Sequence, residues 1–201
     1  MTLEEKVFQV EQFYAQLDSD LTAFQKESKL SCLTGCSSCC QSPEVETTVL
    51  ELLPLAFHLY KENKAETFYD SLIENTSPIC ALYNPISVII QKGGCANYPY
   101  RALICRLFGF SYTRNKIGKP KLLTCSTIKE THSEAYERSI VNATEIEMLP
   151  MAANYQSQLT TIDPNLSQQF YPINKAMIQA IEIVMTHFRY TDNLLDTKKV
   201  S

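Results

Sequence analysis

Eight cysteines occur in this chain of 201 residues, and four of them fall between residues 32 and 40. Thiolates bind zinc and iron–sulfur clusters, and such centres often combine closely spaced cysteines with cysteines from distant parts of the chain. The short spacing supplies one part of a centre locally, and folding brings up the rest. The eight candidate metal ligands are Cys32, Cys36, Cys39, Cys40, Cys80, Cys95, Cys105 and Cys125.

An even number of cysteines is also compatible with four disulfide bonds. Disulfides need an oxidising compartment, and the opening MTLEEKVFQVEQF has neither the basic start nor the apolar stretch of a secretory signal. A bond between the adjacent Cys39 and Cys40 would strain the backbone. We therefore expect a cytoplasmic protein with no membrane association, whose reduced thiols bind metal.

The net charge of −4 is unevenly distributed along the chain. Residues 75–129 contain no Asp or Glu and eight Lys or Arg, so this segment carries +8 and the remainder carries −12. A zinc ion or an oxidised [4Fe–4S] cluster held by four thiolates carries about −2, which nearby cations would offset. We expect Arg101, Arg106 and Tyr98 to contact the cofactor or an anionic substrate; a solvated basic face is the alternative interpretation.

Other classes of function find less support in the sequence. Arginines and aromatic side chains alternate around residues 98–114, as they also do on surfaces that bind single-stranded nucleic acid. The acidic net charge makes nucleic acid an unfavoured partner. The sequence has only five glycines and contains no glycine-rich phosphate loop, dinucleotide fingerprint or nucleophile elbow.

Helices are predicted on both sides of the cysteines. Apolar residues recur at alternating intervals of four and three from Leu3 to Phe24, which predicts one long helix within residues 1–29. This apolar stripe either packs inside the fold or pairs with a second copy in a short coiled coil, which would make a homodimer.

The rest of the chain alternates between helical and irregular stretches. Ser42, Pro43 and Glu44 predict the start of a helix that runs to about Asn63, and a shorter helix follows over residues 64–75. A β-branched run covers residues 86–90, and residues 108–113 and 119–124 predict a β-hairpin that leads back to Cys125. Further helices are expected at about 127–143, 145–160 and 172–189, before a frayed tail.

These elements predict one mostly α-helical domain over residues 1–201. We expect a helical bundle that encloses an irregular cysteine-rich segment with a small β-hairpin. The predicted parts are an N-terminal helix (1–29), a metal-binding core (30–126), C-terminal helices (127–190) and a tail (191–201).

Three motifs in the cysteine-rich segment resemble one family in detail. They are Cys32-x3-Cys36-x2-Cys39-Cys40, then Ser77-Pro78-Ile79-Cys80, then Cys95-Ala-Asn-Tyr98-Pro-Tyr-Arg101-Ala102-Leu-Ile-Cys105-Arg106. Over roughly residues 30–126 this order is similar to the YkgJ-type cysteine-cluster family, the zinc- or iron-chelating CxxCxxCC domain. The chain departs from the family pattern in the three residues after Cys32 and in Ala102, where the family usually has Pro.

The resemblance implies metal chelation by all eight cysteines. Members of the family are described as ferredoxin-like or as iron–sulfur oxidoreductases, and flagellin lysine methylases carry a similar domain. Three hypotheses therefore stay open: a redox protein that presents its centre to a protein partner, an enzyme that modifies a protein or small-molecule substrate, and a structural zinc module. Four of the cysteines stand far from any other, which favours an iron–sulfur cluster, preferably 4Fe–4S, over Zn²⁺.

Overall fold

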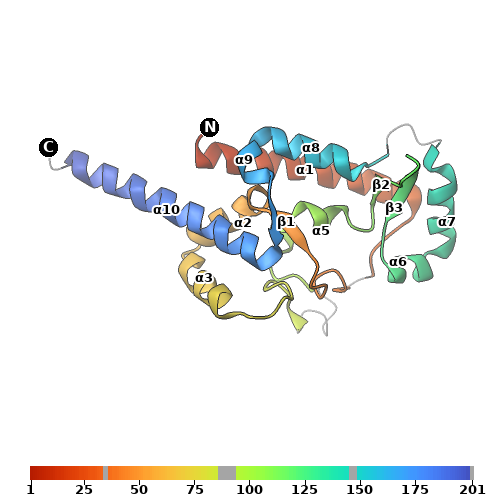
Figure 1. Cartoon of the computed structure of the whole chain (residues 1–201), viewed down its shortest axis with the longest axis horizontal. Coiled ribbons are helices and arrows are strands. Elements are labelled where there is room, and N and C mark those ends of the chain that lie inside the picture. The colour runs from red at the N-terminus through yellow and green to blue at the C-terminus, as the bar shows by residue number, and fades with distance from the viewer. Residues whose placement is uncertain (34–35, 86–93, 145–148, 200–201) are drawn as a thin grey trace.

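The protein, seen in a computed structural model that describes residues 1–33, 36–85, 94–144 and 149–199, is mostly helical (Figure 1). Two small antiparallel sheets, each of two strands, accompany the helices in these ranges. The predicted fold class and the predicted hairpin are confirmed. The β-branched run at 86–90 lies outside the described residues.

The elements have the following bounds in chain order. They are α1 (Leu3–Ser28), β1 (Glu46–Thr48), α2 (Val49–Lys61), α3 (Ala65–Glu74), the 3₁₀ turn η1 (Tyr98–Tyr100), α5 (Leu103–Leu107), β2 (Ser111–Arg114), β3 (Pro120–Leu123), α6 (Ser126–Thr131), α7 (Ser133–Val141), η2 (Asn142–Thr144), α8 (Ala152–Ile162), α9 (Pro164–Ser167), β4 (Phe170–Pro172) and α10 (Ile173–Lys199). Strand β1 pairs with β4, and β2 pairs with β3.

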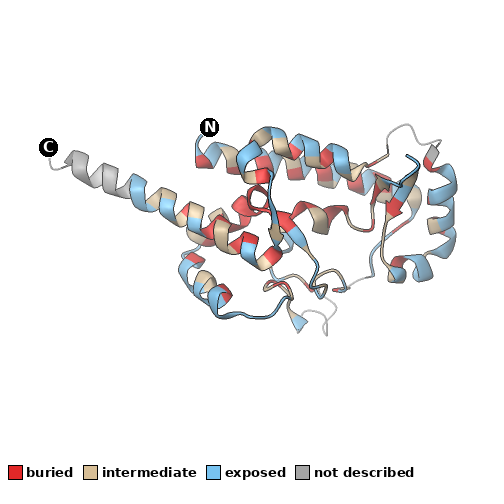
Figure 2. Ribbon diagram, viewed as in Figure 1, coloured by how far each residue is buried: buried red, intermediate tan, exposed pale blue. Residues whose placement is uncertain are grey.

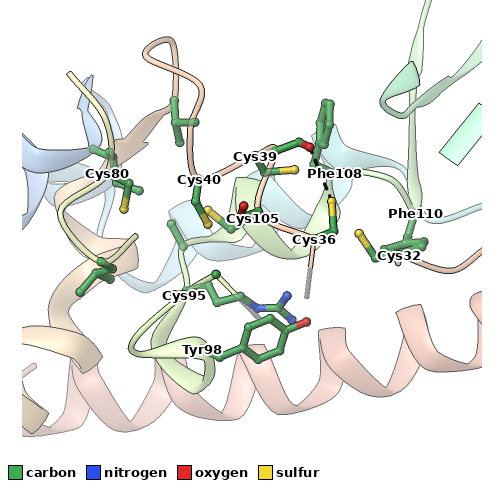
Figure 3. A pocket seen from close by; sticks show the side chains of 18 of the residues that line it. Cys32, Cys36, Cys39, Cys40, Cys80, Cys95, Tyr98, Cys105, Phe108 and Phe110 are labelled. Carbon is green, nitrogen blue, oxygen red and sulfur yellow. Dashed lines mark hydrogen bonds between the residues drawn. The ribbon is translucent and has the colours of Figure 1, made fainter. Parts of the chain in front are cut away.

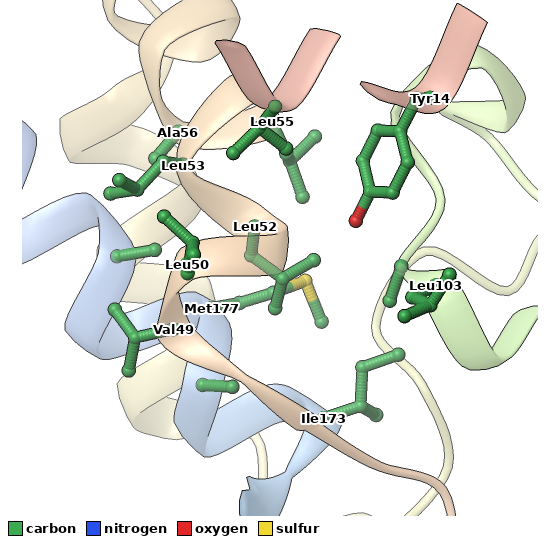
Figure 4. Close-up of a cluster of buried hydrophobic side chains, with 14 of the residues drawn as sticks. Tyr14, Val49, Leu50, Leu52, Leu53, Leu55, Ala56, Leu103, Ile173 and Met177 are labelled. Carbon is green, nitrogen blue, oxygen red and sulfur yellow. The ribbon is translucent and has the colours of Figure 1, made fainter. Parts of the chain in front are cut away.

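Helix α2 is the centre of the main hydrophobic core. Nine of its thirteen residues are buried, which is typical of a helix that is covered on every side. Helices α1 and α10 pack against it, and Tyr14 of α1 and Met177 of α10 reach the same cluster (Figure 4). The hydroxyl of Tyr14 donates a hydrogen bond of 3.0 Å to the backbone carbonyl of Glu51.

Helix α1 confirms the predicted N-terminal helix. The side chain of Thr2 accepts from the backbone of Glu5, and the Glu5 carboxylate accepts from Thr2 in return, which completes a capping box. The whole apolar stripe of α1 is buried within the chain (Figure 2). It is therefore used for core packing, and it does not leave a free seam for a coiled coil with a second copy.

The predicted start of the second helix was wrong. Helix α2 begins at Val49 rather than at Pro43, because Thr48 and Glu51 form a capping box there. The three residues before it form β1, which pairs antiparallel with β4 in the register Glu46 to Pro172. That pairing joins segments more than 120 residues apart, so local sequence signals do not reveal it.

The C-terminal third also differs from the prediction in its boundaries. The predicted helix at 127–143 is divided at His132 into α6 and α7. Helix α8 begins at Ala152, and the predicted start at 145 lies outside the described residues. The backbone N–H of Tyr112 donates to the carbonyl of Pro150 at 2.8 Å, and a β-bridge joins Tyr112 to Met151, so Pro150 and Met151 lie against β2. Helix α10 continues to Lys199, so most of the expected tail is helical. Among the described helices, none combines the length and the hydrophobicity needed to cross a bilayer.

Asp163 links α1 to the short helix α9. Its carboxylate lies 2.6 Å from the Lys6 ammonium and accepts from the backbone N–H groups of Asn165 and Leu166. Burial raises the pKa of Asp163, but Lys6 and the two N–H groups lower it by more. The net pKa is therefore below the ordinary value. The pair therefore stabilises the fold above the ordinary Asp range, and this contribution is lost as the pH falls through the lowered pKa.

The substitution Asp163→Asn keeps a side-chain oxygen for capping and removes the charge that faces Lys6. We expect it to reduce the free energy of unfolding at pH 7 by about 1 kcal/mol, and to reduce it by less at acidic pH. Urea titrations over a pH series measure this difference. Glu62→Gln, which removes an exposed pair with Lys64, is the matched control and is expected to have little effect. An equal loss for Asp163→Asn at every pH would contradict the ion-pair explanation.

Candidate metal centre

A cavity of about 400 Å³ lies beside the core, and seven of the eight cysteines line it. Figure 3 shows these side chains facing the same hollow from several segments of the chain. The eighth, Cys125, is the N-cap of α6, where its sulfur accepts from the backbone N–H of Ile128 at 3.4 Å. All eight cysteines lie in the described ranges and carry free thiols, so the alternative of four disulfides does not apply.

Tight turns present the closely spaced cysteines to the cavity. The backbone N–H of Cys36 donates to Leu33 and that of Cys40 donates to Ser37, at 3.0 and 2.9 Å. Ser37 is buried because Gly94 packs directly against it. A β-carbon on Gly94 would lie only 2.3 Å from the β-carbon of Ser37. The absence of a side chain at Gly94 therefore allows the Cys95 segment to reach the Cys36–Cys40 loop.

Asn174 in the first turn of α10 holds the Cys80 segment. Its side-chain oxygen accepts from the backbone N–H of Ala81, and its side-chain nitrogen donates to Ile79, both at 2.9 Å. An isolated β-bridge between Tyr83 and Cys95 then joins the Cys80 segment to the next cysteine. Nothing in the sequence indicated Asn174, because its partners lie more than 90 residues away.

Glu51 positions the helix that carries Cys105. Its side chain is only 2% exposed, and one carboxylate oxygen accepts from the backbone N–H of Leu103 at 2.8 Å. The other oxygen accepts from Thr48 at the start of α2, so one carboxylate caps both α2 and α5. Burial raises the pKa of Glu51. The sequence prediction missed this residue, although the pattern Thr48-x-x-Glu51 is the signal of a capping box.

Arg106 has a different role from the predicted one. It is 4% exposed and is not among the described residues that line the cavity. Its guanidinium group pairs with Asp18 of α1 and donates to the backbone carbonyls of Pro99 and Arg101. The prediction that Arg106 contacts the cofactor is therefore corrected: in the structure Arg106 fastens the segment before α5 to α1 through Asp18.

Arg101 and Tyr98 both line the cavity, and their contact with a cofactor stays a prediction. The Arg101 guanidinium carbon lies 3.7 Å from the centre of the Tyr98 ring, and Tyr98 is 57% exposed. The Nε atom of Arg101 is buried and has no hydrogen-bond partner within the described ranges. A buried N–H donor without a partner is unfavourable, so this group is suited to an anion in the cavity.

The geometry agrees with a comparison of the sequence with known families. Residues 31–144 match the family model CxxCxxCC, described as "Putative zinc- or iron-chelating domain". The chain belongs to the CxxCxxCC family. The matched region contains all eight cysteines and extends through α7, beyond the predicted boundary at residue 126. A search of curated proteins and a search of solved structures each gave no match.

Burial keeps most of the thiols in the cavity neutral. Burial, followed by the charge of neighbouring thiols, raises the pKa of Cys40 to about 12 and that of Cys39 to about 11. Burial likewise raises the pKa of Cys105. For Cys36 burial acts in the same direction, but the backbone N–H and hydroxyl of Ser38 outweigh it and lower the pKa. Metal binding to these mostly neutral thiols therefore releases protons.

The donor set also fits a metal centre, although no ion site is closed. Among the described residues, no three Cys, His, Asp or Glu side chains already lie close enough to ligate one ion. Four sulfurs around zinc would lie about 3.8 Å apart, given Zn–S bonds of about 2.3 Å. The thiols instead face a hollow that is also lined by apolar side chains. These are Leu33, Val45, Leu52, Leu82, Ala102, Phe108, Phe110 and Ile173.

The contact between Gly94 and Ser37 gives a direct test of the site. Gly94→Ala should force the two cysteine segments apart, reduce the unfolding free energy by about 1–3 kcal/mol and reduce the metal bound per chain. Metal analysis and thermal unfolding measure both effects. The double variant Gly94→Ala with Ser37→Gly removes the colliding β-carbon and should recover part of the loss, with Ser37→Gly alone as the control. Full metal content in Gly94→Ala would contradict the role given to this contact.

Proposed function

We propose that this chain is an iron–sulfur protein whose thiolates hold a [4Fe–4S] cluster for a redox or other cluster-dependent role. The size of the cavity is the observation that carries the proposal. An ion closed in by four sulfurs needs less space than a water molecule, whose share of the liquid is about 30 Å³. A cavity of about 400 Å³ has room for irons together with their inorganic sulfides.

The surroundings of the cavity support an anionic cluster. Arg101 favours the thiolate forms of Cys40, Cys95 and Cys105, since its charge lowers the pKa of each against the effect of burial. Its unpartnered Nε–H group is available to a sulfide or thiolate of the cluster. The apolar lining limits the access of water, which together with hydrogen bonds to sulfur sets the reduction potential.

The exposed edge of the cavity supports a role with a protein partner. Cys32 and Tyr98 both line the cavity and are both exposed to solvent. A cluster in the cavity would therefore lie near the surface, where a partner protein could exchange electrons with it.

One observation favours a second function, a modifying enzyme that acts at the cluster. The unpartnered Nε–H of Arg101 lies beside the exposed Tyr98 ring, where an anionic group of a protein or small-molecule substrate could bind. In that role Arg101 would bind the substrate rather than the cluster.

Anaerobic purification followed by metal and sulfide analysis tests the proposal. We expect a brown protein with iron and acid-labile sulfide in comparable amounts and a broad absorption band in the visible range. A colourless protein with one or two zinc ions and no sulfide would contradict it and would favour the structural zinc module.

Substitution of Arg101 distinguishes the two roles of this residue. If Arg101 faces the cluster, Arg101→Gln should lower the reduction potential, because removing a cation disfavours the more negative reduced state. Arg101→Lys should keep most of the wild-type potential. Arg114→Gln, in the exposed hairpin of the same basic segment, is the matched control. A potential that does not change in Arg101→Gln would contradict the contact with the cluster and would favour substrate binding.

A further inference from the structure

We infer that the eight thiols form two separate centres of four thiolates each, and that the two sets divide between the adjacent residues Cys39 and Cys40. The core-side centre consists of Cys40, Cys80, Cys95 and Cys105. The hairpin-side centre consists of Cys32, Cys36, Cys39 and Cys125. The inference rests on the proposed function and specifies which thiols share each iron–sulfur cluster.

The hydrophobic clusters of the fold separate the distant cysteines into these sets. Cys80 belongs to the main core around α2 and α10, and Cys95 and Cys105 pack against it. Cys125 packs instead against a second cluster of buried side chains. The second cluster consists of Phe24, Leu30, Tyr112, Leu122, Ile128, Ala135 and Ala143. Cys125 is therefore attached to a different part of the core from Cys80, Cys95 and Cys105.

Backbone contacts bring the core-side thiols together. The bridge between Tyr83 and Cys95, with the bond of 2.8 Å from Ala96 N–H to Leu82, places the Cys80 and Cys95 segments side by side. In Figure 3 the sulfurs of Cys40 and Cys105 lie on the same side of the hollow as Cys80. The charges of Cys80, Cys40 and Cys95 are also the ones that raise the pKa of Cys105 beyond the effect of burial.

Another set of contacts brings Cys32 to Cys125. The hydroxyl of Ser31 lies 3.1 Å from Nε2 of His132, the residue between α6 and α7. Leu30, two residues before Cys32, and Ile128, three residues after Cys125, share the second hydrophobic cluster. The segments that carry the two cysteines are therefore held together. Cys32, Cys36 and Cys39 lie toward Phe108 and Phe110 in Figure 3.

The electrostatic neighbours of the hairpin-side thiols agree with this grouping. Cys36, Cys39 and Cys125 are the thiols whose charges raise the pKa of Cys32. For Cys39 the largest effect after burial comes from Cys125. For Cys32 and Cys39, the thiol with the largest effect on the pKa therefore belongs to the same set.

The division between Cys39 and Cys40 has two physical consequences. Their α-carbons are about 3.8 Å apart, as for any consecutive residues, so one peptide bond connects the two clusters and places them near enough to interact magnetically. The centres also differ in access to solvent, since Cys80 is buried and Cys32 is exposed. The hairpin-side cluster should therefore be the first to be lost to a chelator.

Cysteine substitutions test the grouping on the full chain. Cys125→Ser and Cys105→Ser should each lose about half of the iron and sulfide. Adding Cys32→Ser to Cys125→Ser should remove no more, because both belong to one centre. Combining Cys105→Ser with Cys125→Ser should remove nearly all of the metal. Ser126→Ala, which changes the exposed neighbour of Cys125, is the control and should keep the full content.

Electron paramagnetic resonance of the reduced protein provides a second measurement. The wild type should give a spectrum split by interaction between two clusters, and the folded Cys125→Ser variant should give a simple spectrum of one cluster. This variant alters only the hairpin-side centre, so the test remains valid if Cys105→Ser disturbs the main core and fails to fold.

The outcomes separate the inference from the proposed function. A wild type with two zinc ions that falls to one in Cys125→Ser would overturn the iron–sulfur proposal and support the two centres. A single substitution that removes all of the metal, or a Cys105→Ser and Cys125→Ser combination that removes no more than one substitution, would overturn the grouping while metal binding stands. A wild type without bound metal would overturn both.

Discussion

The gathering of seven of the eight thiols around one hollow is the constraint on which the rest of this structure depends. Buried thiols are neutral without metal and repel one another when they ionise, so they do not attract each other into place. Other contacts must hold them. Glu51 caps the helix of Cys105, Asn174 holds the Cys80 segment, and Arg106 fastens the residues before α5 to Asp18. These contacts come from α2, α10 and α1.

The same three helices build the main core, so folding and metal binding are linked. Tyr14 and Glu51 show this connection, because the tyrosine hydroxyl binds the backbone of the residue whose carboxylate caps α5. A metal that binds the folded chain and not the unfolded chain stabilises the folded state by mass action. A bound metal would therefore stabilise the loop of residues 36–40 together with the core.

Local patterns in the sequence predicted the parts of the fold that local contacts determine. Periodicity predicted the apolar stripe of α1, and strand and turn residues predicted the hairpin β2–β3. The start of α2 was misplaced because β1 pairs with a strand more than 120 residues away. Arg106 was assigned to the cofactor because its neighbours in sequence are cysteines, whereas its partner Asp18 comes from α1. Glu51 was within reach of prediction, but Asn174 was not.

X-ray absorption at the edge of the bound metal tests the central claim most directly, because it reports the ligand atoms whichever metal is bound. The account predicts a first shell of sulfur alone at about 2.3 Å, supplied by cysteine thiolates and, for iron, by sulfide. A first shell dominated by nitrogen or oxygen would contradict it, since the metal would then lie outside the hollow that the cysteines line.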